Sequence, residues 1–109
     1  MAKKTEIDLV VDNNVAAGAT VTTTTPVVPL NTRVTVRKFG GYVANGLIVL
    51  QWGSGGSFTT IRAFGGTFEF ELKKDFIGDG AKLFRLVRIN NDTTSKPIVA
   101  WMEAFLDDA

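Results

Sequence analysis

Apolar and polar residues alternate along most of this chain with a period of two, the pattern of a β-strand that buries one face. The clearest example is residues 67–73, in which Phe68, Phe70 and Leu72 should point inward while Glu69 and Glu71 point outward. Comparable segments predict strands over residues 4–11, 21–25, 33–39, 47–52, 58–64, 67–73, 82–90 and 97–106. No segment shows a helical period. The pattern therefore predicts an all-β protein.

Glycine, proline and asparagine separate these segments, as expected of turns. We expect breaks at Gly40-Gly41, at Asn45-Gly46, at Gly65-Gly66 and at the glycine-rich residues 53–56. About eight short, regularly spaced strands are typical of an antiparallel β-sandwich. The number favours a jelly-roll-like arrangement of two sheets, with an immunoglobulin-type sandwich as the second choice.

The 109 residues fit a single domain covering residues 1–109. The formal net charge is only +1, which lacks the basic excess typical of proteins that bind nucleic acid. No apolar run approaches the length of a membrane span, and no secretory leader is legible. We therefore expect a soluble protein made in a cytoplasm, with neither nucleic acid nor membrane as a partner.

Cysteine and histidine are both absent, so the usual nucleophile–base pairs and zinc sites cannot form. Two carboxylate pairs remain. Glu69 and Glu71 share a strand face, but an outward polar face that meets Arg85 or Arg88 explains them better than a glycosidase pair. Asp75 and another loop residue, Asp79, could bind calcium, but they more often form turns. We predict no catalytic residues and no cofactor.

Three aromatic residues could form a stacking platform for a sugar: Tyr42, Trp52 and Trp101. Trp52 ends a predicted strand beside a glycine-rich loop, which makes it the better candidate for exposure. Trp101 lies within a strand and suits a core or an interface. Exposure of these rings should distinguish a sugar-binding protein from one that uses apolar contacts.

Three predicted strands have apolar residues on both faces, although an antiparallel strand usually buries only one. In residues 47–52, one face carries Leu47 and Val49 and the other carries Ile48, Leu50 and Trp52. In residues 97–106, one face carries Ile98, Ala100, Met102 and Leu106 and the other carries Val99, Trp101 and Phe105. In residues 82–90, one face carries Leu83, Val87 and Ile89 and the other carries Phe84 and Leu86. Either loops cover the second face, or another subunit does. The candidate interface residues are Leu47, Val49, Trp52, Ile98, Trp101, Met102 and Phe105.

The second half of the chain resembles part of a known protein family. Gly78-Asp79-Gly80 precedes an apolar strand ending in Asn90-Asn91-Asp92, followed by a last strand rich in alanine and aromatic residues. This arrangement resembles the closing hairpin of the small jelly-roll decoration, or cement, proteins of tailed-phage heads. Jelly-roll sugar-binding domains have a similar closing hairpin.

The resemblance to decoration proteins implies a non-enzymatic protein of the virion surface. Such a protein would associate with itself, usually as a trimer or a dimer with the trimer favoured, and would hold neighbouring subunits of a major capsid protein together. The alternative is a carbohydrate-binding jelly-roll module used in adhesion. Neither resemblance assigns a role to an individual residue of this chain.

Overall fold

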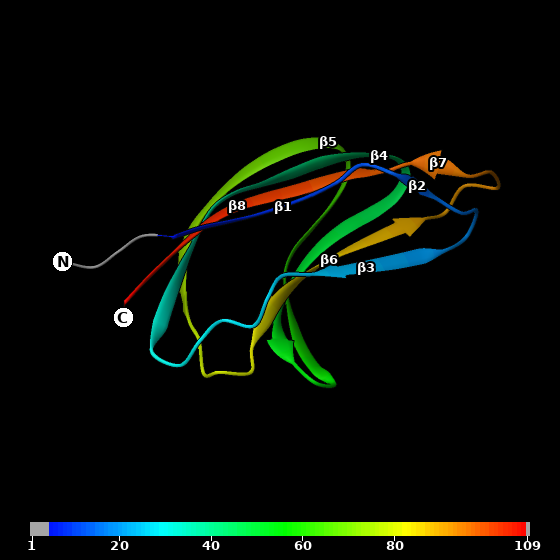
Figure 1. The fold of residues 1–109 in the computed structure, drawn as a ribbon. Helices are drawn as coiled ribbons and strands as arrows, with labels where there is room; N and C mark the ends of the chain where they lie inside the picture. Colours follow the sequence, from blue (N-terminus) through cyan, green and yellow to red (C-terminus); the bar gives the residue numbers. More distant parts are fainter. Residues whose placement is uncertain (1–4, 109) are drawn as a thin grey trace.

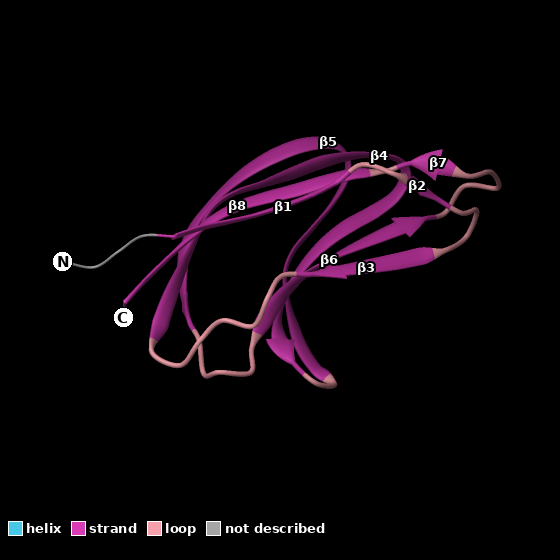
Figure 2. Ribbon diagram, viewed as in Figure 1, coloured by secondary structure: helices cyan, strands magenta, loops and turns pink. Residues whose placement is uncertain are grey.

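The computed structural model describes residues 5–108, except the side chains of residues 5–8 and of Lys73. Strands form most of the described chain, and no helix occurs in it (Figure 2). The strands are β1 (Thr5–Val11), β2 (Asn14–Val15), β3 (Thr20–Thr24), β4 (Thr32–Ser54), β5 (Ser57–Ile77), β6 (Leu83–Asn90), β7 (Lys96–Pro97) and β8 (Val99–Asp108). The start of the predicted first strand, residue 4, lies outside the described residues.

The described chain is one long antiparallel hairpin whose tip is the turn between Ser54 and Ser57. Outward from this tip, β4 pairs with β5, β3 with β6, β2 with β7, and β1 with β8. The hairpin folds over on itself, because β4 also pairs with β6 and with β8. This folded double ribbon is the connectivity of a jelly roll, so the predicted fold class is confirmed.

Two layers result, because β4 and β5 each bend and contribute one arm to each layer (Figure 1). In the first sheet the order is β1, β8, the first arm of β4 (residues 32–43) and the second arm of β5 (residues 66–77). In the second sheet it is β3, β6, the second arm of β4 (residues 46–54) and the first arm of β5 (residues 57–64).

Three of the predicted breaks between strands are wrong. Gly40-Gly41 and Asn45-Gly46 lie inside β4, and Gly65-Gly66 lies inside β5. The register shifts between Val43 and Ile48, where β4 has four residues opposite one residue of β5. Such a bulge bends a strand pair without ending it, so these glycines allow the hairpin to cross between layers.

The core fills the space between the sheets and is almost entirely apolar. Fully buried side chains from both layers meet there: Val34, Val36, Phe39, Ile48, Leu50, Phe84, Leu86, Ile98, Ala100, Met102 and Ala104. Phe68, Phe70 and Leu72 turn inward as predicted, but they are only half-buried. They lie on β5, which pairs only with β4 in the described chain, so one side of these residues has no neighbouring strand.

Two polar side chains are buried at the end of the sandwich near β2 and β7. The Arg88 guanidinium donates from Nη1 to the carbonyl oxygens of Asn13, at 3.1 Å, and of Ile98, at 3.0 Å. Asn90 donates from Nδ2 to the carbonyl oxygen of Val15 at 2.9 Å and to that of Thr94 at 3.1 Å. These bonds tie together the two segments that cross between the layers.

Candidate interaction surfaces

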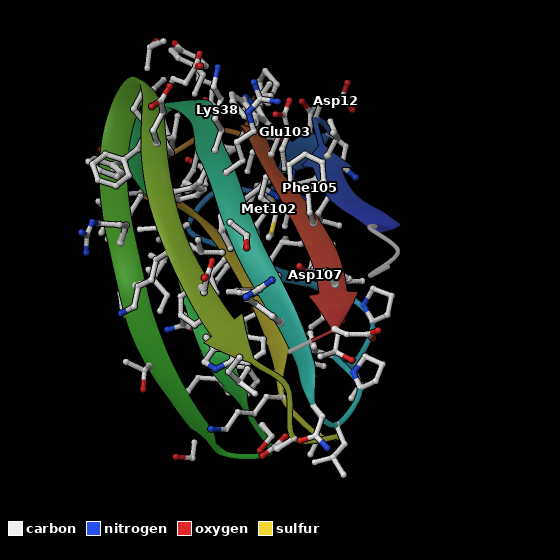
Figure 3. All side chains as sticks on the ribbon, turned by 90° about the vertical axis from the view of Figure 1, so that its left-hand side faces the viewer. Asp12, Lys38, Met102, Glu103, Phe105 and Asp107 are labelled. Atoms are coloured by element: carbon white, nitrogen blue, oxygen red, sulfur yellow. The ribbon has the colours of Figure 1, made fainter. Side chains whose placement is uncertain are left out.

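The last strand, β8, alternates between the two faces of the first sheet from Val99 to Phe105. Ile98 and Met102 have no exposed surface and belong to the core. Trp101 and Phe105 point to the outer face and are half-buried, and Figure 3 shows Phe105 and Met102 leaving β8 on opposite sides. Ile98, which directly precedes β8, and Met102 are therefore removed from the candidate interface, because both side chains point into the core.

The candidates from residues 47–52 lie on the other sheet. The side chains of Leu47 and Val49 point to the outer face of the second sheet, where Leu47 is 41% exposed and Val49 is 9% exposed. Trp52 points inward. Trp52 was the better candidate for exposure, but it is only partly exposed, and its ring packs 4.4 Å from that of Phe84 and 5.3 Å from that of Phe76. The remaining candidates thus lie on opposite faces of the molecule and cannot form one continuous interface.

An apolar patch covers the outer face of the second sheet, and we call it the second-sheet patch. It consists of Leu47, Val49, Val87 and Ile89, which the pairing of β4 with β6 places directly opposite one another. Beside it, Thr20, Thr22 and Thr24 expose their side chains on the edge strand β3. The two-sided pattern of residues 82–90 signalled Val87 and Ile89, but they were not among the candidate residues.

A second apolar patch, which we call the first-sheet patch, lies on the opposite outer face. It consists of Val10, Tyr42, Val99 and Trp101, on three neighbouring strands. Val10 is 67% exposed and Tyr42 is 45% exposed. The indole of Trp101 lies over Gly40, because a Cβ atom at Gly40 would be 2.5 Å from its Cζ2 atom.

Exposed apolar residues also gather at one end of the sandwich, where two loops lie together at the bottom of the view in Figure 1. Backbone hydrogen bonds join these loops, from Gly78 N to Thr32 O at 2.8 Å and from Asn31 N to Gly78 O at 3.2 Å. Val27, Leu30 and Ile77 are exposed here at 46%, 65% and 53%. The opposite end, with residues 91–95, is polar.

Glu69 and Glu71 lie on the outer face of the first sheet, as predicted, and both are exposed. Glu69 forms an ion pair with Lys38 at 3.0 Å. The expected partners Arg85 and Arg88 belong to the second sheet: Arg85 lies over the ring of Phe58, and Arg88 is buried. The two glutamates thus lie on an open, solvated surface.

Asp75 lies within β5 and not in the predicted loop, whereas Asp79 does lie in a loop, and each accepts hydrogen bonds from the protein. Thr35 Oγ1 donates to Asp75 Oδ1 at 2.7 Å, and the backbone N–H groups of Ala81 and Lys82 donate to Asp79 Oδ1 at 2.9 Å. The bonds from Ala81 and Lys82 lower the pKa of Asp79. In the described part of the chain, no three acidic side chains are grouped so that they could hold a metal ion.

Comparison with known proteins adds no relative: no family model matches the chain, and a search of curated proteins gives no significant match. The described residues also contain no helix long and apolar enough to cross a membrane.

Proposed function

We propose that this chain is a non-enzymatic structural protein that associates with itself and attaches to a larger protein surface. The observation that carries the proposal is the pair of apolar patches on opposite outer faces of the sandwich. The core is already filled by the inward-facing residues, so neither patch is needed to stabilise the single chain. Apolar surface that is left exposed on both faces is typical of proteins that work in an assembly.

Two patches on opposite faces suit a protein that makes two different contacts. The second-sheet patch is purely aliphatic and is bordered by threonines. The first-sheet patch contains Tyr42 and Trp101 and is bordered by the charged pair Lys38 and Glu69. One face can hold another copy of the chain while the other meets a different protein, as a cement protein requires.

The specific form that we propose is a decoration protein on the head of a tailed phage. Its support is the resemblance of the closing hairpin, together with the jelly-roll connectivity and the two apolar faces. The partner is then a major capsid protein, the location is the virion surface, and a trimer is the state that the resemblance favours. This form accounts for a small domain that needs no catalytic residue.

The experiment compares substitutions at the centre of each patch with one at the polar end. Leu47→Lys and Val10→Lys place a charge in the second-sheet and first-sheet patches, and Ser95→Lys is the control at an exposed loop position. Light scattering measures self-association, and co-sedimentation measures attachment to heads assembled from the major capsid protein of the same genome. We expect each patch variant to weaken at least one of these two contacts while Ser95→Lys keeps both. A monomeric parent protein that does not sediment with the heads would refute the proposal.

The exposure of Tyr42 beside Trp101 favours a second candidate function, the binding of carbohydrate. Two neighbouring aromatic side chains on a sheet face can stack against sugar rings, and Glu69 and Thr67 lie next to them to form hydrogen bonds. Titration with soluble xylan and laminarin, followed by tryptophan fluorescence, tests this alternative. A saturable change that is lost in Tyr42→Ala would support sugar binding.

A further inference from the structure

The sheets of this sandwich end in strands with free edges, and these edges differ in how they are protected. An unprotected edge can pair with a strand of another chain, and proteins prevent this with charged residues that point inward. On β5, Arg62 lies 5.1 Å from the ring of Phe70, and Lys74 lies 5.4 Å from the ring of Phe76. Both charges cover the inner side of β5, so this long edge is protected against pairing.

The edge strand β3 has no such protection. Its five residues, Thr20–Thr24, contain four threonines and one valine and carry no charge. Threonine and valine favour extended strands, and β3 pairs only with β6 in the described chain. The sequence of β1, by contrast, includes Glu6 and Asp8. Of these three edges, β3 is the one best suited to accept another strand.

The hydrogen bonds that flank β3 identify the backbone groups that are free at its edge. Asn90 N donates to Ala19 O at 3.0 Å, and Thr25 N donates to Phe84 O at 2.9 Å. In an antiparallel pair, alternate residues bond to the partner strand while the residues between them point away. With the register of β3 on β6, Val21 and Thr23 therefore bond to β6. The N–H and C=O groups of Thr20, Thr22 and Thr24 point to the open edge.

This edge is complementary to itself. If two copies meet antiparallel with a two-fold axis at Thr22, then Thr22 faces Thr22 and Thr20 faces Thr24. Every residue in these pairs offers a free donor and a free acceptor, and antiparallel Thr–Thr pairs stabilise a sheet. We infer that a second copy of this chain docks along β3 and joins the two second sheets into one. This inference rests on the self-association that we propose above, and it assigns that contact to the β3 edge and not to the face of an apolar patch.

The joined sheet would have a further consequence for the second-sheet patch. Since β6 lies next to β3, the apolar residues Val87 and Ile89 of both copies would share one continuous outer face. The pair would thus present about twice the apolar area of a single chain to a larger partner. A two-fold contact between identical edges closes at two copies, so the assembly unit is a dimer and not the trimer that the resemblance favours.

Substitution of Thr22 by proline tests the edge directly. Proline removes the N–H group that points to the open edge, while the bonds of β3 to β6 belong to residues on either side of it. Thr22→Ala is the matched control, because it changes the side chain and keeps the N–H group. Light scattering should show a dimer for the parent and for Thr22→Ala, and half that mass for Thr22→Pro. Circular dichroism checks that all three are folded.

Single cysteines provide a second test that does not depend on the folding of the proline variant. The chain has no cysteine of its own, so a disulfide can form only between two copies. At the proposed axis the two Thr22 Cα atoms would be about 5.5 Å apart, within the range of a disulfide. Thr22→Cys should therefore give a covalent dimer on mild oxidation. Thr20→Cys, which is also exposed on β3, should not form a covalent dimer. In the proposed pairing, Thr20 of one copy lies four residues along the strand from Thr20 of the other copy.

The outcomes separate this inference from the proposed function. Loss of association in Thr22→Pro with crosslinking confined to Thr22→Cys would support pairing along β3. A parent that self-associates, as a dimer or a trimer, with Thr22→Pro unchanged or Thr20→Cys crosslinking equally, would overturn the β3 contact and leave the proposed function intact. A parent that is monomeric and does not bind phage heads would overturn both.

Discussion

The indole ring of Trp101 on β8 occupies the space above Gly40 on β4. A Cβ atom added at Gly40 would lie 2.5 Å from Cζ2 and 2.8 Å from Cε2 of this ring, and 2.9 Å from the carbonyl oxygen of Phe68. The glycine is thus required by the packing of an outward-facing aromatic side chain across the neighbouring strand. The same contact holds Trp101 against the sheet, within the first-sheet patch.

Gly40→Ala should therefore lower the free energy of unfolding by about 1–3 kcal/mol, the usual cost of overpacking. Gly56→Ala is the control, because a Cβ atom there would meet no atom within 4 Å. Urea denaturation of both variants measures the difference. Equal stability of the two variants would show that Trp101 moves away from Gly40 without cost.

The alternation of apolar and polar residues predicted most of the strands, and their number favoured a jelly roll. The short strands β2 and β7 and the continuity of β4 and β5 were not predicted. A glycine pair such as Gly65-Gly66 serves equally well in a turn and in a bend, and Gly66 does have a positive φ of 71°. What decides between them is whether the flanking residues pair with each other or with distant ones. Phe39 pairs with Phe70, far along the chain, and no local pattern contains that information.

The sequence predicted that some strands carry apolar residues on an outer face, but it did not identify which residues lie on that face. Two apolar faces on residues 97–106 indicated an interface, yet both faces look alike in the sequence, so Met102 and Trp101 could not be separated. The pairing of β8 with β4 decides the question, because it places Met102 opposite the fully buried Phe39 and Trp101 opposite Gly40. The local pattern also does not tell which sheet each strand joins. This assignment to sheets is the reason that Leu47 and Trp101 face opposite directions.

The phenylalanines of the core and of the open edge should differ in their contribution to stability. Phe39 has no exposed surface, so Phe39→Ala should cost about 3–5 kcal/mol. Phe70 points inward, as the sequence predicts, but it is only half-buried on β5, so Phe70→Ala should cost only about 1–2 kcal/mol. Chemical denaturation of the two variants under one set of conditions tests this order. A larger loss in Phe70→Ala would mean that the edge strand is covered in solution.

Asp79 should make the stability of the fold depend on pH in the acid range. Its pKa is lowered in the folded protein because its carboxylate accepts hydrogen bonds from the N–H groups of Ala81 and Lys82. The ionised form stabilises the fold above the ordinary pKa of an aspartate, about 3.9, and this stabilisation is lost as the pH falls through the lower folded value. Thermal unfolding between pH 6 and pH 2 should therefore show a smaller acid-induced decrease in Tm for Asp79→Asn than for the parent. An identical decrease in both would contradict this role.

Arg88 should stabilise the end of the sandwich through its two hydrogen bonds and its volume, and not through its charge. Burial lowers the pKa of its guanidinium, which shows that the charge itself is disfavoured there, and its Nε has no hydrogen-bond partner among the described residues. Arg88→Ala removes the bonds and leaves a cavity, so it should cost about 3 kcal/mol or more.

Arg88→Met is the informative comparison, because methionine fills much of the same volume and carries no charge. The substitution leaves the carbonyl oxygen of Ile98 without the hydrogen bond from Arg88, which costs about 1–3 kcal/mol of stability. It also removes the cost of burying a charged group. The carbonyl oxygen of Asn13 keeps a second donor, the N–H group of Ile98 at 3.3 Å. Arg88→Met should therefore be clearly more stable than Arg88→Ala in urea denaturation. If the two variants unfold at the same urea concentration, the hydrogen bonds outweigh the packing, and Arg88 holds the crossing segments by its guanidinium alone.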